Sequence, residues 1–525
     1  MSASANLPEL VIGLAGPIGV DIDSITESIE AALDDVNYKT QVIKLTTAMM
    51  SYEVKTQIIK GTDFCSEMNY KIDYADALCD ENKDLSFLSR VAVKAILERR
   101  KYITGDEGTP AQGTAYILRQ FKRPEEINLM RNVYGKHFVL ISAYGSASDR
   151  KFILESKQKK SSPTKSLPSD SSAKVDRLIE RDASEAHKFG GQQLRDTFHL
   201  ADVFIDGISK PEMDRKLSRF FRAFFGLNTA APTKDEYGMY TAKSASLRSC
   251  DLSRQIGAAI FTSDGEIVTQ GCNEVPKAFG GTYWDLEEPD YRDIKMGFDP
   301  NDEQKYELLR DLIERLWDDD LLSEKATELG TISKLIAKIT SKAAKSGELD
   351  GALVGSAVLD LTEFGRVVHA EMGAICDAAR LGRSIKGTTL YSTTFPCHNC
   401  TKHILSSGIK RVVYMEPYPK SKAKELHKNE ITIETESGDC VSFVPFIGIA
   451  PFRYRDIFQK SRKRKDKNGN AKTWYSESGE REPMLDTTYN SYLELESGAL
   501  VSMLGDFENA PQSSTVSVKI EGEIS

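Results

Sequence analysis

Residues 367–417, VVHAEMGAICDAARLGRSIKGTTLYSTTFPCHNCTKHILSSGIKRVVYMEP, decide the fold of the second half of the chain. Helical spacing at the start gives way to a strand pattern at 388–394, a second helix at 400–408 and a second strand at 411–417. Upstream of this stretch, the apolar runs 255–262 and 266–273 are separated by Ser-Asp-Gly, which is typical of a hairpin. The alternation of helices and strands predicts an α/β unit.

The first half of the chain shows the same alternation. The segment ELVIGLAG (9–16) has the pattern of a short apolar strand that runs into glycines, and helical spacing follows at 25–36. Two further strand patterns, KHFVLISAY (136–144) and ADVFIDG (201–207), are separated by helical or polar sequence. This order predicts a parallel α/β sheet.

Breaks in these patterns divide the chain. After a helical pattern at 212–226, the sequence NTAAPTKDE interrupts the periodicity, so we expect the main boundary near Thr229. The predicted units are 1–228, 229–460 and a C-terminal extension at 461–525.

Three segments within these units differ in composition from their surroundings. Residues 155–174 are rich in Ser, Lys and Pro and are expected to be a mobile surface segment. Residues 287–350 form a long polar and helical insertion, and loops of that length usually have structure or a function of their own. The tail of the extension is expected to be disordered.

The composition indicates a globular protein and limits its partners. Of 525 residues, 40% are hydrophobic and 28% are charged, and no apolar run is long enough to span a bilayer. The start MSASANLPEL does not have the pattern of a secretory signal, so we expect a cytoplasmic protein without a membrane role. A net charge of −9 disfavours broad nucleic-acid binding but allows one local pocket for a small nucleotide.

Four residues in the quoted stretch have the spacing of a catalytic metal site. His369 and Glu371 stand in HAE, and Cys397 and Cys400 stand in PCHNC, in the order H-x-E…P-C-x-x-C that marks zinc nucleobase deaminases. Two cysteines three apart at a helix start share one face and can bind one Zn²⁺ together with His369, while a fourth position stays open for water. Zinc brings the pKa of such a water toward neutrality, and Glu371 is predicted to move protons between the water, the ring and the leaving amine.

The alternative interpretation is a structural zinc knuckle. Such a site needs a fourth Cys or His ligand, and the nearby candidates are His398 and His403. His398 points away from the Cys face, and His403 lies about one turn beyond Cys400. The joint order of the motifs favours catalytic over structural zinc.

Residues 237–417 resemble the deoxycytidylate deaminase family through SLRSCDLSRQIGAAI and QGCNEVP, together with the two zinc motifs. In that family the Asn of the second element contacts the sugar, so the resemblance implies that Asn273 is a substrate-binding residue; a plain turn role remains the alternative. Arg248 and Arg254 face either the substrate phosphates or the solvent. Thr393 lies at a strand end that lines the pocket in similar enzymes.

The segment GLAGPIGVDIDS (13–24) resembles the phosphate loop of small-molecule kinases, with Gly13, Gly16, Gly19 and Ser24 as its candidate nucleotide-binding residues. Aligned on the glycines, Ile22 stands where the loop lysine belongs and Asp23 where the magnesium-binding hydroxyl belongs. We therefore expect a P-loop kinase-like domain that has lost phosphoryl transfer and acts as a nucleotide sensor or scaffold. An active kinase and a purely structural domain remain open.

The combination of both domains resembles the bacterial antiphage dCTP deaminases over nearly the whole chain. The resemblance implies zinc-dependent conversion of dCTP, dCMP or both to uracil nucleotides, which depletes the dCTP pool of a replicating phage. It also implies homo-oligomers, allosteric control by a nucleotide and, in some members, inhibition by a small RNA. A housekeeping dCMP deaminase, an RNA or single-stranded DNA editor, and a nucleotide-binding regulator with a vestigial site are the alternatives.

Overall fold

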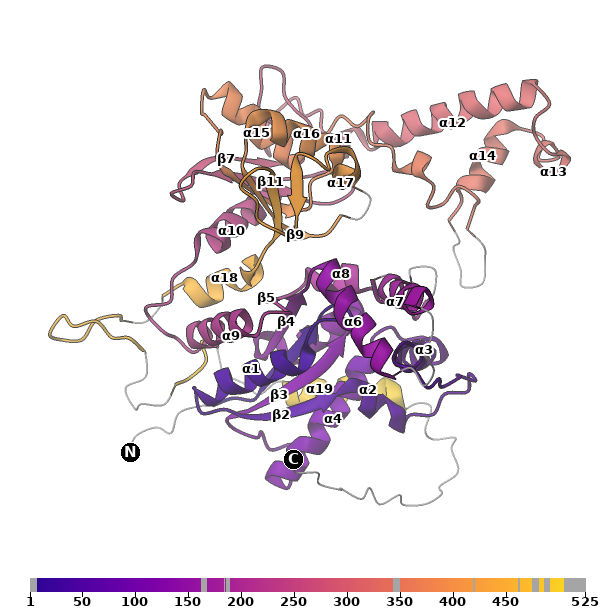
Figure 1. Cartoon of the computed structure of the whole chain (residues 1–525). Coiled ribbons are helices and arrows are strands. Elements are labelled where there is room, and N and C mark those ends of the chain that lie inside the picture. The colour runs from indigo at the N-terminus through magenta and orange to yellow at the C-terminus, as the bar shows by residue number, and fades with distance from the viewer. Residues whose placement is uncertain are drawn as a thin grey trace.

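Two six-stranded sheets, one in each half of the molecule, organise the chain (Figure 1). The computed structural model describes residues 7–161, 168–183, 185, 189–342, 350–418, 421–460, 463–474, 481–485 and 492–504. Both sheets are mainly parallel and carry helices, so the predicted α/β class with two sheet-containing units is confirmed.

The first sheet has the strand order β12-β5-β4-β1-β3-β2, and its first five strands in sequence are parallel. One face packs on α1 and α9, and the other face packs on α4 and α5. Alternate side chains of β1 enter the two cores, because successive residues of a strand point to opposite faces. The elements of this unit are β1 (Leu10–Ala15), α1 (Ile22–Asp34), β2 (Lys39–Lys44), α2 (Leu45–Ala48), α3 (Phe64–Asn82), α4 (Phe87–Thr104), β3 (Thr114–Phe121), α5 (Pro124–Tyr134), β4 (Phe138–Tyr144), α6 (Ala147–Ser161), α7 (Pro168–Ala183), α8 (Leu194–Phe198), β5 (Val203–Asp206) and α9 (Lys210–Phe224).

The second sheet has the order β10-β11-β9-β8-β6-β7. The predicted hairpin is present as the antiparallel pair β6–β7, and β8, β9, β11 and β10 continue in parallel. Helices α15 and α16 cover one face and α10 covers the other. The elements are α10 (Lys234–Ser246), β6 (Gly257–Phe261), β7 (Ile267–Cys272), α15 (Ala370–Arg380), β8 (Thr389–Thr394), α16 (His398–Ser407), β9 (Arg411–Glu416), α17 (Ala423–Leu426), β10 (Ile431–Ile433) and β11 (Val441–Pro445).

The chain returns to the first sheet after β11. The short strand β12 (Gly448–Ile449) pairs antiparallel with β5, and α18 (Pro451–Phe458) contacts α9 and α10. The buried Glu236 of α10 accepts from the Ile449 amide at 2.9 Å and pairs with Arg219 of α9 at 2.7 Å. The return to the first sheet thus lies at Gly448, upstream of the boundary that the sequence suggested near 460.

The insertion contains α11 (Asp293–Met296), α12 (Pro300–Asp318), α13 (Glu324–Thr327) and α14 (Ile332–Thr340). The last three form a helical arm at the upper right of Figure 1, whereas α11 lies near α16 in that view. Leu309, Ile313, Leu335 and Ile336 give the arm a small core of its own. The expectation that this long segment has its own structure is met.

The segment 155–174, which the sequence marked as mobile, is helical where the structure describes it. Residues 155–161 belong to α6 and 168–174 to α7, because these helices contribute Leu154, Val175 and Leu178 to a buried cluster. Residues 162–167 and the expected disordered tail at 505–525 lie outside the described residues.

Of the described helices, none is both long and apolar enough to cross a membrane.

A buried ion network attaches the C-terminal helix α19 (Tyr492–Leu504) to the first unit. Arg100 of α4 pairs with Glu9 at 2.8 Å and with Glu496 of α19 at 2.7 Å, and the three side chains are at most 2% exposed. Tyr492 also donates to Glu9 at 2.9 Å. An arginine cannot discard its proton, so it requires both carboxylates in this setting.

We therefore expect Glu496→Ala to lower the free energy of unfolding of the first unit by about 3 kcal/mol, because it leaves Arg100 buried with an incomplete set of partners. Equilibrium urea unfolding followed by circular dichroism measures the change. Glu494→Ala, at an exposed position of the same helix, is the matched control. Equal stability of the two variants would contradict the role of the network.

Candidate active site

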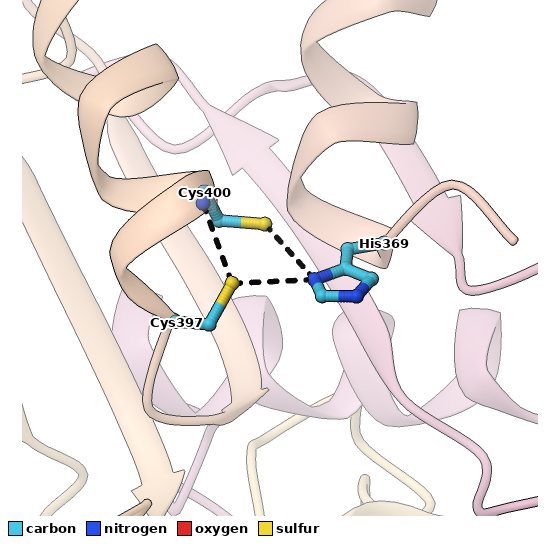
Figure 2. A group of neighbouring side chains, drawn as sticks. All are labelled: His369, Cys397 and Cys400. Carbon is cyan, nitrogen blue, oxygen red and sulfur yellow. Dashed lines mark hydrogen bonds between the residues drawn. The ribbon is translucent and has the colours of Figure 1, made fainter. Parts of the chain in front are cut away.

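Three donor atoms meet at the N-termini of two helices that cover the second sheet (Figure 2). His369 is the N-cap residue of α15, Cys397 is the N-cap residue of α16, and Cys400 lies in the first turn of α16. The His369 Nδ1 atom is 3.3 Å from Cys397 Sγ and 3.4 Å from Cys400 Sγ. All three donors lie within 4.8 Å of one another, close enough to share one ion at the usual zinc distances of about 2.1 Å to nitrogen and 2.3 Å to sulfur.

Close packing of α15 on the sheet positions this group. A Cβ atom on Gly271 of β7 would lie 2.2 Å from the Ala370 carbonyl oxygen, so any side chain there would push the start of α15 away. That start carries His369 and Glu371. On the other side, β8 ends at Thr394 and leads directly into α16 with its two cysteines.

The chemistry of the donors fits a cation. The hydrogen bond from Cys400, followed by the interaction with His369, lowers the pKa of Cys397 to about 4. The hydrogen bond to Cys397 raises the pKa of His369 to about 9, and the same thiolate together with burial raises the pKa of Cys400. The surroundings thus favour the thiolate form of Cys397, and a bound cation would favour the thiolate form of Cys400 as well.

The donor group has three members within the described ranges of the chain, and neither His398 nor His403 joins it. A structural zinc site normally has four protein ligands, whereas a catalytic site keeps one position open. The geometry therefore favours the catalytic alternative of the two that the sequence left open.

Glu371 lies beside the donor group and is 4% exposed. Its Oε1 accepts from Ser392 Oγ at 3.4 Å, and its Oε2 accepts from Cys400 Sγ at 3.6 Å. Burial raises the pKa of this carboxyl group. A carboxyl group with a raised pKa can both accept and donate a proton near neutral pH.

A cavity of about 580 Å³ opens over the donor group. His369, Glu371 and Cys397 line it together with residues of the insertion and of the loop before His369, namely Asp293, Asp299, Asn301 and Arg366. The sequence analysis missed this contribution. Only the position of Arg366, three residues before His369, offered a signal, because the other three are brought in by the fold of the insertion.

The predicted substrate-binding residues differ in their positions. Asn273 lines the cavity, but its amide accepts from the Ile256 backbone at 2.7 Å and donates to the Arg254 carbonyl at 2.8 Å. Arg254 lines the cavity as well, with its guanidinium 3.7 Å from Glu416.

Arg248 and Thr393 lie outside this lining. Arg248 lines a separate cavity of about 170 Å³, where it donates to Thr282 and lies 3.7 Å from the centre of the Trp284 ring. Thr393 is 1% exposed and accepts from the Gly257 amide at 3.1 Å.

The residues predicted for the N-terminal loop lie in a strand, in the loop itself and in the helix that follows. Gly13 lies within β1, where a Cβ atom would approach the Phe121 and Phe138 rings to 2.8 Å. Gly16 and Gly19 lie in the loop before α1, and Gly19 has a φ of +99°, which favours glycine. Ser24 donates its hydroxyl to Asp21, the N-cap residue of α1.

Comparison with known proteins shows what the second unit is similar to. Residues 232–416 match the family model of the cytidine and deoxycytidylate deaminase zinc-binding region. The deoxycytidylate deaminase of Enterobacteria phage T2 is 54% identical over 55 residues, which cover 10% of this chain and 29% of that protein. The cytosine deaminase of Candida albicans strain SC5314 is 47% identical over 51 residues, covering 10% of this chain and 34% of that protein. The chain thus spans about a third of the length of these relatives.

Among solved structures, the dCMP deaminase from cyanophage S-TIM5 in complex with dCMP and dUMP is 18% identical, with a TM-score of 0.22, over 41% of this chain and 98% of that chain. This TM-score is too low to establish a shared fold. The fold is defined by the strand order described above. The family match and the donor geometry concern the same part of the chain. Residues 232–416 are therefore similar to the zinc-binding region of the cytidine and deoxycytidylate deaminases.

Proposed function

We propose that the protein is a zinc-dependent hydrolase that deaminates free deoxycytidine nucleotides, dCTP and dCMP, to the corresponding uracil nucleotides. The observation that carries this proposal is the clustering of the donors His369, Cys397 and Cys400 beside Glu371. Three of these four residues line one cavity. The family match of residues 232–416 supports the same chemistry.

His369, Cys397 and Cys400 would hold the ion, which when bound supplies a Lewis acid that lowers the pKa of water to near neutrality. Glu371 accepts one proton of the attacking water and delivers it to ring N3 while the water oxygen bonds to C4. It then accepts the second proton, from the new C4 hydroxyl, and passes it to the amine. The C4–N bond breaks, ammonia leaves, and one water is consumed. The buried position of Glu371 and its raised pKa suit this repeated proton transfer.

The walls of the cavity support a free nucleotide as the substrate. Arg254, Arg366 and Lys422 line the cavity, each beside a carboxylate, and we propose that they turn to the phosphates of a bound nucleotide. The loop before His369 and the base of the insertion form one wall of the cavity. Such a wall suits a free nucleotide better than a continuous nucleic-acid strand. The net charge of −9 also disfavours an RNA or single-stranded DNA editor.

The biological role that we propose is depletion of dCTP in antiphage defence, with thymidylate supply by a housekeeping dCMP deaminase as the alternative. The additional α/β unit and the insertion favour the first role, since dCMP deamination alone requires neither. We further propose a cytoplasmic homo-oligomer that is regulated by a nucleotide, with a small RNA as a candidate inhibitor. These points rest on the resemblance of the whole chain to the antiphage enzymes.

We expect Glu371→Gln to lower the rate of deamination by about 10²- to 10⁴-fold, because the proton carrier is lost while the metal ligands stay. Ammonia release and zinc content are measured on the same preparation. Glu430→Gln, at an exposed position of the same unit, is the control and should retain full activity. A Glu371→Gln enzyme with normal turnover would remove Glu371 from the mechanism.

A substrate panel tests the proposed function directly. Purified full-length protein is incubated with dCMP, dCTP, CTP, cytosine and a cytosine-containing oligonucleotide, and ammonia is followed for each. We expect turnover of the deoxycytidine nucleotides, because cationic side chains line the same cavity as the zinc site. Preferential turnover of the oligonucleotide or of free cytosine would overturn the assigned substrate class.

A further inference from the structure

The glycine-rich loop at 16–21 has the place of a phosphate-binding loop, between the first parallel strand and the first helix. In such loops the backbone amides point at the bound phosphate. Here they donate to acceptors of the chain itself. Three amides donate to backbone carbonyls: that of Val20 to Pro17, that of Asp21 to Gly207 and that of Ile22 to Val20. The amide of Ser24 donates to the Asp21 side chain.

The carboxylate of Asp182, on α7, takes up a further amide of the loop. Its Oδ2 accepts from the Ile18 amide at 2.7 Å, across 164 positions of the sequence. Its Oδ1 lies 2.6 Å from Lys122 Nζ. The Asp182 side chain is 3% exposed, so this negative group is held inside the fold against the loop.

Two cations accompany this carboxylate. Lys122 follows β3 directly, is 13% exposed and also donates to the Gly16 carbonyl at 2.8 Å. Arg150 of α6 donates to the Gly145 carbonyl at 2.9 Å and to the Ile18 carbonyl at 3.3 Å. A backbone amide, an ammonium and a nearby guanidinium form the kind of environment that binds a phosphate.

Several contacts hold α7 in this position. Val175 and Leu178 are buried in the cluster that also contains Leu154 of α6. Arg181, adjacent to Asp182, pairs with Asp73 at 2.7 Å and with Asp76 at 3.2 Å, both on α3. The carboxylate of Asp182 is thus presented by a docked helix.

We propose that Asp182 is an internal substitute for phosphate that closes the glycine-rich loop while α7 is docked. A phosphate-bearing ligand can enter only when this carboxylate leaves, because two anions cannot share the Ile18 amide and the Lys122 ammonium. Loss of the carboxylate leaves the Ile18 amide without its acceptor and Lys122 without its counter-charge, next to Arg150, and opens an anion site. This inference does not depend on the deaminase activity.

The closed loop also lies close to the second unit. The Ala147 amide, at the start of the helix that carries Arg150, donates to Glu434 Oε2 at 3.3 Å. Glu434 follows β10 of the second sheet. Release of Asp182 would therefore alter the surroundings of Arg150 near the boundary between the two units.

Hydrogen–deuterium exchange of the full-length protein, with and without inorganic pyrophosphate, tests the proposal at the loop itself. In the unaltered protein we expect slow exchange in the peptide spanning 16–24 and no effect of pyrophosphate while α7 stays protected. In Asp182→Ala, exchange in this peptide should be at least about tenfold faster, because a hydrogen bond to a charged group is lost. Pyrophosphate should then restore protection.

Asp182→Ser is the second variant, should the alanine variant fail to fold. Asp176→Ala, on the exposed side of α7 where Asp176 pairs with Lys151, is the matched control and should behave as the unaltered protein. Protection of the loop by pyrophosphate in the unaltered protein, without faster exchange in α7, would overturn the proposal. So would folded Asp182 variants that show unaltered exchange or no protection by pyrophosphate.

Discussion

The meeting of two helix N-termini at one edge of the second sheet is the constraint on which the candidate active site depends. His369 and Cys397 are both N-cap residues, so the position of each donor is fixed by where α15 and α16 begin. These starting points are fixed in turn by the packing of both helices on the same face of the sheet. A shift of either helix by one residue would separate the His369 nitrogen from the cysteine sulfurs, and a shift of α15 would also displace Glu371.

The second unit is also joined firmly to the first. Buried residues of α10, β8 and β9 belong to the same core cluster as residues of β1, α4 and α5. The ion pair between Arg453 and Asp202, 3.0 Å apart and almost fully buried, adds a charged contact where the chain returns to the first sheet. Continuous packing of this kind connects the two units physically.

Much of the architecture could be predicted because its signals are local. The periodicity identified β1, β4, β5 and α9 in the first unit, and the hairpin and the helix–strand alternation in the second. The sequence analysis did not identify β2, whose segment KTQVIK places lysines at both ends of a half-exposed edge strand and dilutes the apolar pattern. The helices at 155–161 and 168–174 were obscured by their Ser- and Lys-rich composition, because their helical state depends on burial against α3.

The site shows the same division between local and distant information. The motifs HAE and PCHNC contain the zinc donors and Glu371. By contrast, Asp293, Asn301 and Asp182 reach their sites through tertiary contacts that sequence spacing does not reveal.

Zinc K-edge X-ray absorption on the purified protein is the sharpest test of a catalytic zinc site. We expect two sulfurs at about 2.3 Å, one imidazole nitrogen at about 2.1 Å and one light non-protein ligand. A shell of four protein ligands, or a protein that binds no zinc, would contradict it.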